Sequence, residues 1–206
     1  MPQITDIKPQ AKRAGYYNIF VDGKFALALS ELDLSSSLLK VGQLLSASEL
    51  RELHSTYTKS KCYHYALRYL ATRPRSAKEM RDYLIRKDFR TADIESAILK
   101  LQESNYLDDQ KFAELWVENR MRLNPKSSSV LVAELIKKGI DKEIISTVMA
   151  NLSHSDQLSG LVSIIESKSS QTRYRDKQKL IEYLARKGYN YGLIKEALDS
   201  TNFYPE

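Results

Sequence analysis

One six-residue pattern recurs three times along this 206-residue chain, and it constrains the fold more than any other feature. The chain reads LIRKDF at residues 84–89, LIKKGI at 135–140 and LARKGY at 184–189, so the copies are separated by 51 and then 49 residues. Each copy has the features of a helix end, because cations favour the last turn and glycine favours the left-handed residue that follows it. Asp88 stands where the other two copies have glycine and tolerates this conformation less well. Self-similarity at a nearly constant period indicates a tandem repeat.

The agreement extends over the residues that surround each copy. Apolar residues stand four before, ten after and fourteen after the leading leucine: Met80, Leu131 and Leu180; Ile94, Ile145 and Ile194; Ile98, Met149 and Leu198. The preceding links also match, as TRPRS (72–76), LNPKS (123–127) and TRYRD (172–176). The chain is therefore predicted to be mainly α-helical, with tandem three-helix repeats at 61–107, 108–155 and 156–206 that form an elongated array.

The first repeat contains the signals of three short helices. Pro74 ends the first helix, and Ser76 and Glu79 form the capping box that begins the second. The third helix carries apolar residues on one face, at Ile94, Ala97, Ile98 and Leu101. These four positions are predicted to be buried.

Residues 1–60 follow a different pattern. Asp22-Gly23 lies between two alternating apolar segments, which predicts a β-hairpin with strands near 16–21 and 24–29. A second capping box at 46–49 is expected to begin a helix that runs into the repeats. Because an isolated hairpin is marginally stable in water, this small β-hairpin region must lean on a neighbour or on a few further short strands.

The composition is typical of a folded protein from a reducing compartment. Hydrophobic residues make up 42% of the chain and charged residues 28%, and no apolar run approaches the ~20 residues of a membrane span. The N-terminal residues lack the apolar core of a secretory signal. Cys62 is the single cysteine and cannot form an internal disulfide. We therefore expect a cytoplasmic protein that makes no membrane contact.

The excess of positive charge is local. The chain has 32 Lys and Arg residues against 26 Asp and Glu, and residues 61–107 contain 10 of these cations and 6 of the anions. A localised surplus favours an anionic partner such as nucleic acid. A basic, solvated helix face explains the charge equally well.

No combination of residues predicts catalysis or metal binding. The three histidines lie in separate segments, and Cys62 and His64 are two apart on a helix and point to different faces. Asp108-Asp109 resembles a carboxylate pair, but its place before an apolar run favours helix N-capping, and Trp116 in that run is expected in the core. The chain also lacks a phosphate-binding glycine loop and a nucleophile with a base partner. We therefore expect a protein that is not an enzyme and has no metal or cofactor.

One segment resembles a known family. YLDDQKFAELWVENR, residues 106–120, resembles the central signature of the RecX family of recombinase regulators, in which Tyr-Leu-Asp-Asp precedes Phe-Ala, an aromatic residue and an arginine. RPRSAKEMRDYLIRKDF (73–89) is similar to the family's first module and ELIKKGI (134–140) to its second, while YYNIFVDGKFALAL resembles the N-terminal extension of its longer members. The resemblance is weakest in residues 156–206.

The resemblance implies three-helix modules in an elongated, curved array. It also implies binding to the RecA recombinase and to its filament on single-stranded DNA, with DNA itself as a further partner. We expect the protein to be a monomer. In the family this binding inhibits ATP hydrolysis, strand exchange and filament growth through a basic surface. The middle module departs from the family pattern, because Val130 and Val132 stand where a cation is expected. That module is neutral overall, and its share in any DNA contact is expected to be smaller.

The repeated cations have two interpretations. They stabilise helix C-termini electrostatically, or they contact the filament, which also explains the cations in the preceding links. The candidates for filament and DNA binding are Arg73, Arg75, Lys78, Arg81, Arg86, Lys87, Arg120, Lys137, Lys138, Arg173, Arg175, Arg186 and Lys187.

Two alternative functions remain open from the residues alone. Paired short helices can imitate a helix-turn-helix and form an autonomous DNA-binding module, although no helix here concentrates the Arg, Asn and Gln residues that base readout needs. A protein-only helical scaffold fits the repeat but leaves the charge bias unexplained.

Overall fold

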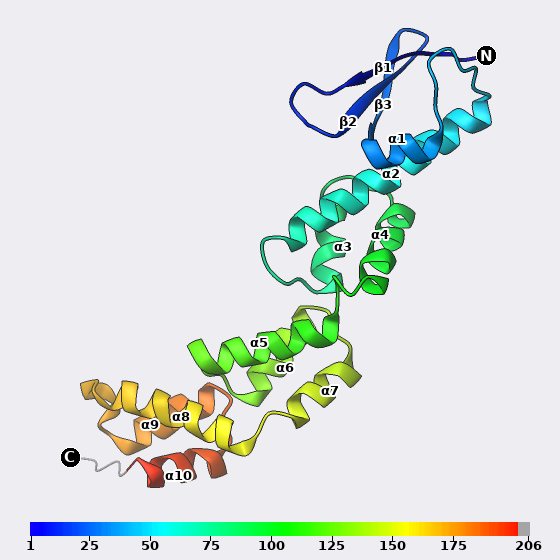
Figure 1. Cartoon of the computed structure of the whole chain (residues 1–206). Helices are drawn as coiled ribbons and strands as arrows, with labels where there is room; N and C mark the ends of the chain where they lie inside the picture. The colour runs from blue at the N-terminus through cyan, green and yellow to red at the C-terminus, as the bar shows by residue number, and fades with distance from the viewer. Residues whose placement is uncertain (202–206) are drawn as a thin grey trace. The chain divides into compact units, whose positions relative to one another are not determined.

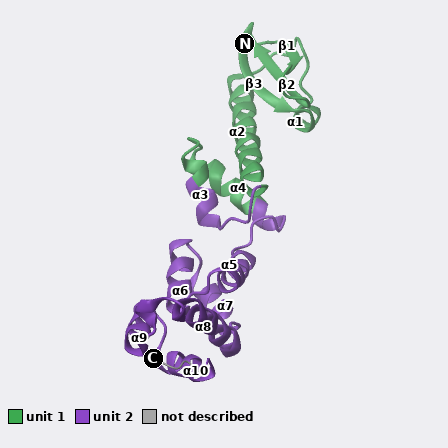
Figure 2. Ribbon diagram, turned by 90° about the vertical axis from the view of Figure 1, so that its left-hand side faces the viewer, with its two compact units in different colours: residues 1–71, 83–100 green, residues 72–82, 101–206 purple. Residues whose placement is uncertain are grey.

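The structure is a computed structural model that describes residues 1–201, and this part of the chain contains ten α-helices and a three-stranded sheet (Figure 1). Its elements are β1 (Ile4–Pro9), β2 (Tyr16–Val21), β3 (Lys24–Ser30), α1 (Glu31–Ser37), α2 (Ala47–Leu70), α3 (Ala77–Ile85), α4 (Thr91–Glu103), α5 (Asp109–Leu123), α6 (Ser128–Lys137), α7 (Lys142–Ala150), α8 (His154–Ser169), the 3-10 helix η1 (Thr172–Tyr174), α9 (Lys177–Arg186) and α10 (Tyr191–Ser200). The chain divides into two compact units, residues 1–71 with 83–100 and residues 72–82 with 101–206 (Figure 2). The predicted mainly α-helical fold with an N-terminal hairpin is confirmed.

The hairpin is part of an antiparallel sheet in the order β1-β2-β3. Asp22 and Gly23 both have positive φ, 49° and 74°, as a type I′ turn requires, so β2 and β3 are joined as the Asp-Gly pair predicts. The sheet buries Ile4, Ile19, Leu27 and Leu29 against Leu45 and Leu53. β1 and the start of α2 thereby provide the neighbours that a lone hairpin needs.

Helix α2 is a single helix of 24 residues. It begins at the predicted capping box. The Ser46 hydroxyl accepts a hydrogen bond from the backbone amide of Glu49, and the Glu49 carboxylate accepts one from the backbone amide of Ser46. Leu53 contributes to the core of the sheet, whereas Cys62 and Ala66 are buried further along the same helix. The lead-in helix and the first helix of the first repeat are thus continuous.

The repeats bury the positions that their periodicity predicts, except that Met149, the equivalent of Ile98 and Leu198, is only partly buried against the core of the second repeat. In the first repeat, the residues that are at most 4% exposed include Met80, Leu84, Ile94, Ala97, Ile98 and Leu101. The second repeat packs α5, α6 and α7 around a core that contains Leu131, Leu135, Ile145 and Val148. The third packs α8, α9 and α10 around the corresponding Leu180, Leu184, Ile194 and Ala197. Deletion of a fully buried leucine side chain from such a core costs about 2–5 kcal/mol.

The three copies of the opening pattern adopt one backbone motif. Asp88, Gly139 and Gly188 have φ values of 58°, 77° and 85°, and each donates its amide to the carbonyl three residues earlier. The following residue donates to the leading leucine, as Ile140 does to Leu135 at 3.1 Å. This is the Schellman end of a helix, whose hydrogen bonds satisfy two otherwise unpaired carbonyls. The pattern therefore encodes a local structure completely.

The same helix ends also accept hydrogen bonds from the preceding repeat. The Ser76 hydroxyl at the start of α3 donates to the carbonyl of Lys138 at the end of α6, and Ser127 at the start of α6 donates to the carbonyl of Lys187 at the end of α9, both at 2.7 Å. A Cβ atom on Gly188 would lie 2.7 Å from the Ser127 hydroxyl oxygen. Glycine is thus required here for close approach as well as for its positive φ.

The matching places at the ends of the series differ. Asp176 occupies the place of the two serines in the third repeat and accepts the amides of Gln178 and Lys179. An ionised carboxylate caps a helix but cannot donate to a carbonyl. Asp88, in the place of the two glycines, has an exposed side chain in the first repeat. Asp88 and Asp176 therefore keep the local structure of their helix ends. Neither provides the group found at a junction between repeats, which is a serine hydroxyl donor at the place of Asp176 and a glycine at the place of Asp88.

Candidate nucleic-acid interface

Two of the candidate cations bind one carboxylate at the junction between the first and second repeats. The Lys138 ammonium lies 2.6 Å from Glu79, and the Arg73 guanidinium donates to both oxygens of Glu79 at 3.1 Å. Burial alone would raise the pKa of Glu79, but the hydrogen bonds from Arg73 and Lys138 outweigh it and lower this pKa to about 2. The two cations therefore stabilise the fold.

A second pair of cations surrounds Trp116. The indole nitrogen donates to Glu134 at 2.7 Å, and Arg120 donates to the same carboxylate at 2.8 Å. Arg120 and Lys138 lie 4.5 Å and 4.6 Å from the centre of the indole ring, within the range of a cation–π contact. Trp116 is half-buried and packs against the core of the second repeat instead of lying inside it.

Three further candidates lie near polar groups of the same unit. Lys78 donates to the carbonyl of Lys137 at 3.2 Å, and Arg75 donates to the hydroxyl of Thr72 at 2.9 Å. Arg81 lies close enough to Asp109 to act on its pKa. The side chain of Lys137 itself is exposed.

The adjacent aspartates have separate structural roles. Asp108 caps α5 by accepting the amide of Lys111 at 3.0 Å, as predicted. Asp109 instead accepts the amide of Ala77 in the first turn of α3, at 2.8 Å. Burial raises the pKa of Asp109. Both carboxylates are thus engaged in capping helices.

The remaining candidates are exposed at the ends of α3 and α9 and in the link before α9: Arg86, Lys87, Arg173, Arg175, Arg186 and Lys187. Within unit 1, the Lys87 ammonium lies 5.8 Å from the ring of Tyr83, which stacks on Tyr69 at 4.0 Å. Within unit 2, Lys187 lies 5.6 Å from the ring of Tyr183. The first and third repeats thus each place a lysine beside a tyrosine at the same helix end.

The middle repeat lacks this arrangement. Glu134 occupies the place of Tyr83 and Tyr183, and Lys138, in the place of the two lysines, binds Glu79. The positions of the cations in the sequence do not show this difference, because the pattern Leu-x-x-Lys occurs in all three copies. The residue before the leading leucine is the signal that identifies it.

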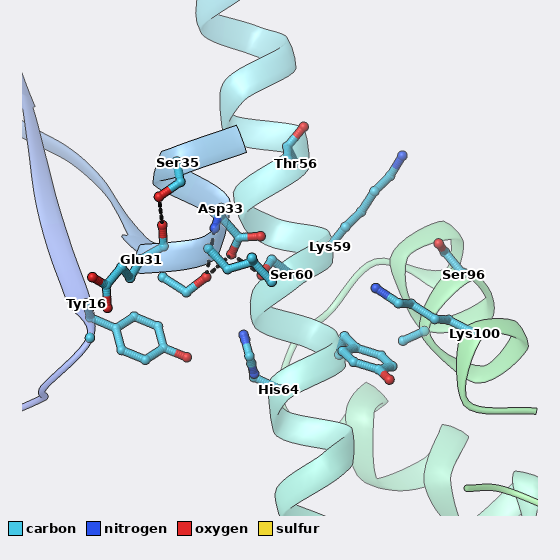
Figure 3. Close-up of a pocket in the computed structure, with 15 residues that line it drawn as sticks. Tyr16, Glu31, Asp33, Ser35, Thr56, Lys59, Ser60, His64, Ser96 and Lys100 are labelled. Carbon is cyan, nitrogen blue, oxygen red and sulfur yellow. Dashed lines mark hydrogen bonds between the residues drawn. The ribbon is translucent and has the colours of Figure 1, made fainter. Parts of the chain in front are cut away.

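A separate hollow of about 810 Å³ lies in unit 1 among α1, α2 and α4 (Figure 3). Asp33 accepts the Ser60 hydroxyl at 2.6 Å, which joins α1 to α2. Burial lowers the pKa of His64, whose ring contacts Tyr16 edge to face at 6.0 Å. The charged residues of the hollow are Glu31, Asp33, Lys59 and Lys100, with two of each sign. This balance gives the hollow no preference for an anionic partner.

The described residues, 1–201, contain no group of three His, Cys, Asp or Glu side chains that could hold a metal ion. The buried thiol of Cys62 has its pKa raised to about 11, first by burial and then by the charge of Asp93. Among the same residues, no helix is both long and apolar enough to span a bilayer.

Comparison with known proteins agrees with this architecture. Models of the first, second and third three-helix domains of RecX match residues 62–101, 108–149 and 166–198. Regulatory protein RecX of Listeria welshimeri is 31% identical over 205 residues, which cover 97% of this chain and 76% of the relative. Regulatory protein RecX of Bacillus subtilis is 32% identical over 207 residues, covering 98% of this chain and 78% of the relative.

Two crystal structures have similar folds. One, of a regulatory protein RecX, superposes with a TM-score of 0.76 over 97% of this chain and 100% of its own, at 24% identity, and shows the fold. The other, RecX from Lactobacillus salivarius, has a TM-score of 0.64 and 30% identity, covering 71% of this chain and 98% of its own. On the three domain models and the curated relatives together, this chain belongs to the RecX family of regulatory proteins.

Proposed function

We propose that this protein binds the RecA recombinase and its filament on single-stranded DNA, and that it inhibits ATP hydrolysis, strand exchange and filament growth. The proposal is supported by membership of a family of regulatory proteins. In this proposal the protein is cytoplasmic, like the recombinase that it binds, and acts as a monomer. It regulates the recombinase without catalysing a reaction and without a cofactor.

One observation carries the choice of contact residues. The sequences YLIRKD and YLARKG of the first and third repeats place an exposed Arg-Lys pair after a tyrosine, and the lysine lies 5.8 Å or 5.6 Å from that ring. Cations beside aromatic rings are typical of surfaces that follow a single-stranded backbone. The proposed contacts are therefore Arg86 and Lys87 in the first repeat and Arg186 and Lys187 in the third.

The other candidate cations are expected to contribute less to filament binding. Arg73, Arg120 and Lys138 form ion pairs inside unit 2, and breaking such pairs to reach phosphate would cost part of the binding energy. Lys78 binds a backbone carbonyl, and Arg75 and Arg81 interact within the same unit. Arg173 and Arg175 are exposed in the link that precedes α9 and are retained as auxiliary contacts.

The test compares equivalent positions of the repeat. The variants Arg86→Gln/Lys87→Gln and Arg186→Gln/Lys187→Gln should each weaken binding to the RecA filament at least about tenfold. Lys137→Gln is the positional control, because Lys137 occupies the same place as Arg86 and Arg186 in the neutral repeat. It removes one charge where each variant removes two, and its effect should be less than half of theirs on a logarithmic scale. The measurements are filament binding and inhibition of RecA ATP hydrolysis over a salt titration.

The outcome also separates the alternatives. Each phosphate contact contributes roughly 0.7 to the slope of log affinity against log salt on a single strand, so loss of two contacts should lower that slope by about 1.4. Equal affinity for naked and recombinase-coated DNA would favour an autonomous DNA-binding module. If both double variants inhibit the recombinase like the unaltered protein at every salt concentration, the cations serve only as helix-end residues and the proposal is wrong.

A further inference from the structure

A second hollow lies within unit 2, between the link that precedes α6 and the helices α8 and α9. It has a volume of about 490 Å³. Four cations line it: Lys126, Lys168, Arg186 and Lys187. No aspartate or glutamate is among its lining residues, and none of the four cations pairs with a carboxylate within residues 1–201. Like charges gathered in a concave surface raise the local concentration of anions.

The repeat shows where a countercharge is missing. At the junction of the first two repeats, Glu79 neutralises Lys138 at 2.6 Å. The equivalent residues at the next junction are Val130 and Lys187, and Val130 lines the hollow beside that lysine. The chain thus keeps the cation at this place and replaces its carboxylate with an apolar side chain. The arrangement leaves the Lys187 ammonium available to an external anion.

Two tyrosines complete the hollow. Lys168 and Lys187 lie 5.7 Å and 5.6 Å from the ring centre of Tyr183, so that both ammonium groups adjoin one aromatic ring. Tyr189 also lines the hollow, is 7% exposed, and has a buried hydroxyl with no hydrogen-bond partner among the described residues. A buried donor without a partner destabilises a protein, and an acceptor oxygen that reaches it removes that penalty.

We propose that this hollow binds a phosphodiester group of single-stranded DNA, with Lys168, Lys187 and the Tyr189 hydroxyl as donors and the Tyr183 ring beside the nucleotide. The inference rests on the proposed function, since the filament is the source of the DNA strand. A phosphodiester fits better than an acidic peptide because the hollow combines cations with aromatic rings, the pairing that follows a nucleic-acid backbone and its bases. Lys126 and Arg186 add charge at the margin of the same hollow.

The decisive variant is Val130→Glu. It places a carboxylate where Glu79 stands in the preceding repeat, so the new side chain should pair with Lys187 and occupy the anion site. It also puts a glutamate in the first turn of α6, where its carboxylate can accept a hydrogen bond from the Ser127 amide and suits the positive end of the helix, so the thermal stability should be preserved or raised. Loss of binding with no loss of stability is a result that a merely structural role of Val130 would not produce.

The assay measures the fluorescence anisotropy of a labelled oligodeoxythymidylate with the full chain. Val130→Glu and Lys168→Gln/Lys187→Gln should each raise the Kd at least about tenfold, and the lysine variant should also lower the salt slope by about 1.4. Tyr189→Phe removes only the unpartnered hydroxyl and should weaken binding by up to about tenfold while leaving the melting temperature unchanged or higher. Lys195→Gln is the control for Val130→Glu, because it changes the net charge equally at an exposed site outside the hollow.

Two results would overturn the inference. One is an affinity of Val130→Glu for the oligonucleotide equal to that of Lys195→Gln, which includes the case in which the unaltered protein does not bind naked DNA. The other is a loss of binding to DNA-free recombinase with no change in oligonucleotide binding, which would assign the hollow to a protein partner. Failure of the unaltered protein to bind the recombinase filament would instead refute the proposed function, and the oligonucleotide assay would still decide the role of the hollow.

Discussion

Replacement of Glu79 with glutamine removes one negative charge from the junction between the first two repeats and keeps most of its shape. Glutamine serves as well as glutamate at the third position of a capping box, so the cap between Ser76 and residue 79 should persist. What disappears is the charge that binds Lys138 at 2.6 Å and Arg73 at 3.1 Å. The substitution therefore isolates the two ion pairs from the helix cap.

The magnitude follows from the pKa of Glu79, which falls from 4.5 to about 2 on folding. Each pKa unit corresponds to about 1.4 kcal/mol, which sets a ceiling of about 3.5 kcal/mol on the contribution of Glu79 to the free energy of unfolding. The Arg73 side chain is 43% exposed and the Lys138 side chain 23%. Because solvent screens the more exposed pair, we expect Glu79→Gln to cost about 1–2 kcal/mol at pH 7.

The pH dependence gives the sharper test. A carboxylate whose pKa is lower in the folded state stabilises the protein above its unfolded pKa, and this contribution is lost as the pH falls from about 5 to 2. The stability difference between the unaltered protein and Glu79→Gln should therefore shrink over that interval. Taking the difference cancels the contributions of the other carboxylates, which both proteins share.

Urea unfolding at several pH values, followed by the fluorescence of the single tryptophan, measures this difference. Trp116 is a suitable reporter because the Lys138 ammonium lies 4.6 Å from its ring. Glu103→Gln removes a charge from an exposed side chain of the same unit and serves as the control. A Glu79→Gln effect no larger than the control at pH 7, or one that stays constant between pH 5 and 2, would refute the role of the ion pairs.

Three further outcomes are expected. Gly188→Ala should destabilise the protein by at least about 1 kcal/mol more than Gly23→Ala in thermal unfolding, because both residues have positive φ but only the former would bring a Cβ against the Ser127 hydroxyl; equal losses would mean that the junction yields freely. Ile98→Ala should cost about 2–5 kcal/mol, whereas Leu99→Ala, at a side chain that is 57% exposed, should stay within about 0.5 kcal/mol, and similar values would show that the buried face is misassigned. The Cys62 thiol, fully buried and with a pKa raised to about 11, should react with a disulfide reagent at neutral pH only in denaturant, and rapid modification of the native protein would contradict its burial.

The sequence by itself determined the features whose interactions lie within a few residues. The Schellman ends at Asp88, Gly139 and Gly188, the capping boxes and the type I′ turn could all be predicted, because each involves hydrogen bonds between near neighbours. The buried faces could be predicted as well, apart from the partly buried Met149, since one apolar stripe per helix recurs at equivalent places in all three repeats. Interactions between near neighbours determine such features, and their recurrence in all three repeats indicates which of them are structurally important.

Only the tertiary structure decided how the repeated residues are used. Ser76 is a helix cap in the sequence, and nothing near it indicates that its hydroxyl also reaches the carbonyl of Lys138, 62 residues away. Lys138 and Lys187 end their helices alike, yet the first binds Glu79, and the second lines a hollow that contains Val130 and whose charged residues are all cations. The reason is that a lysine acquires its role from the charges that folding brings within a few ångströms of it, and those charges belong to a neighbouring repeat.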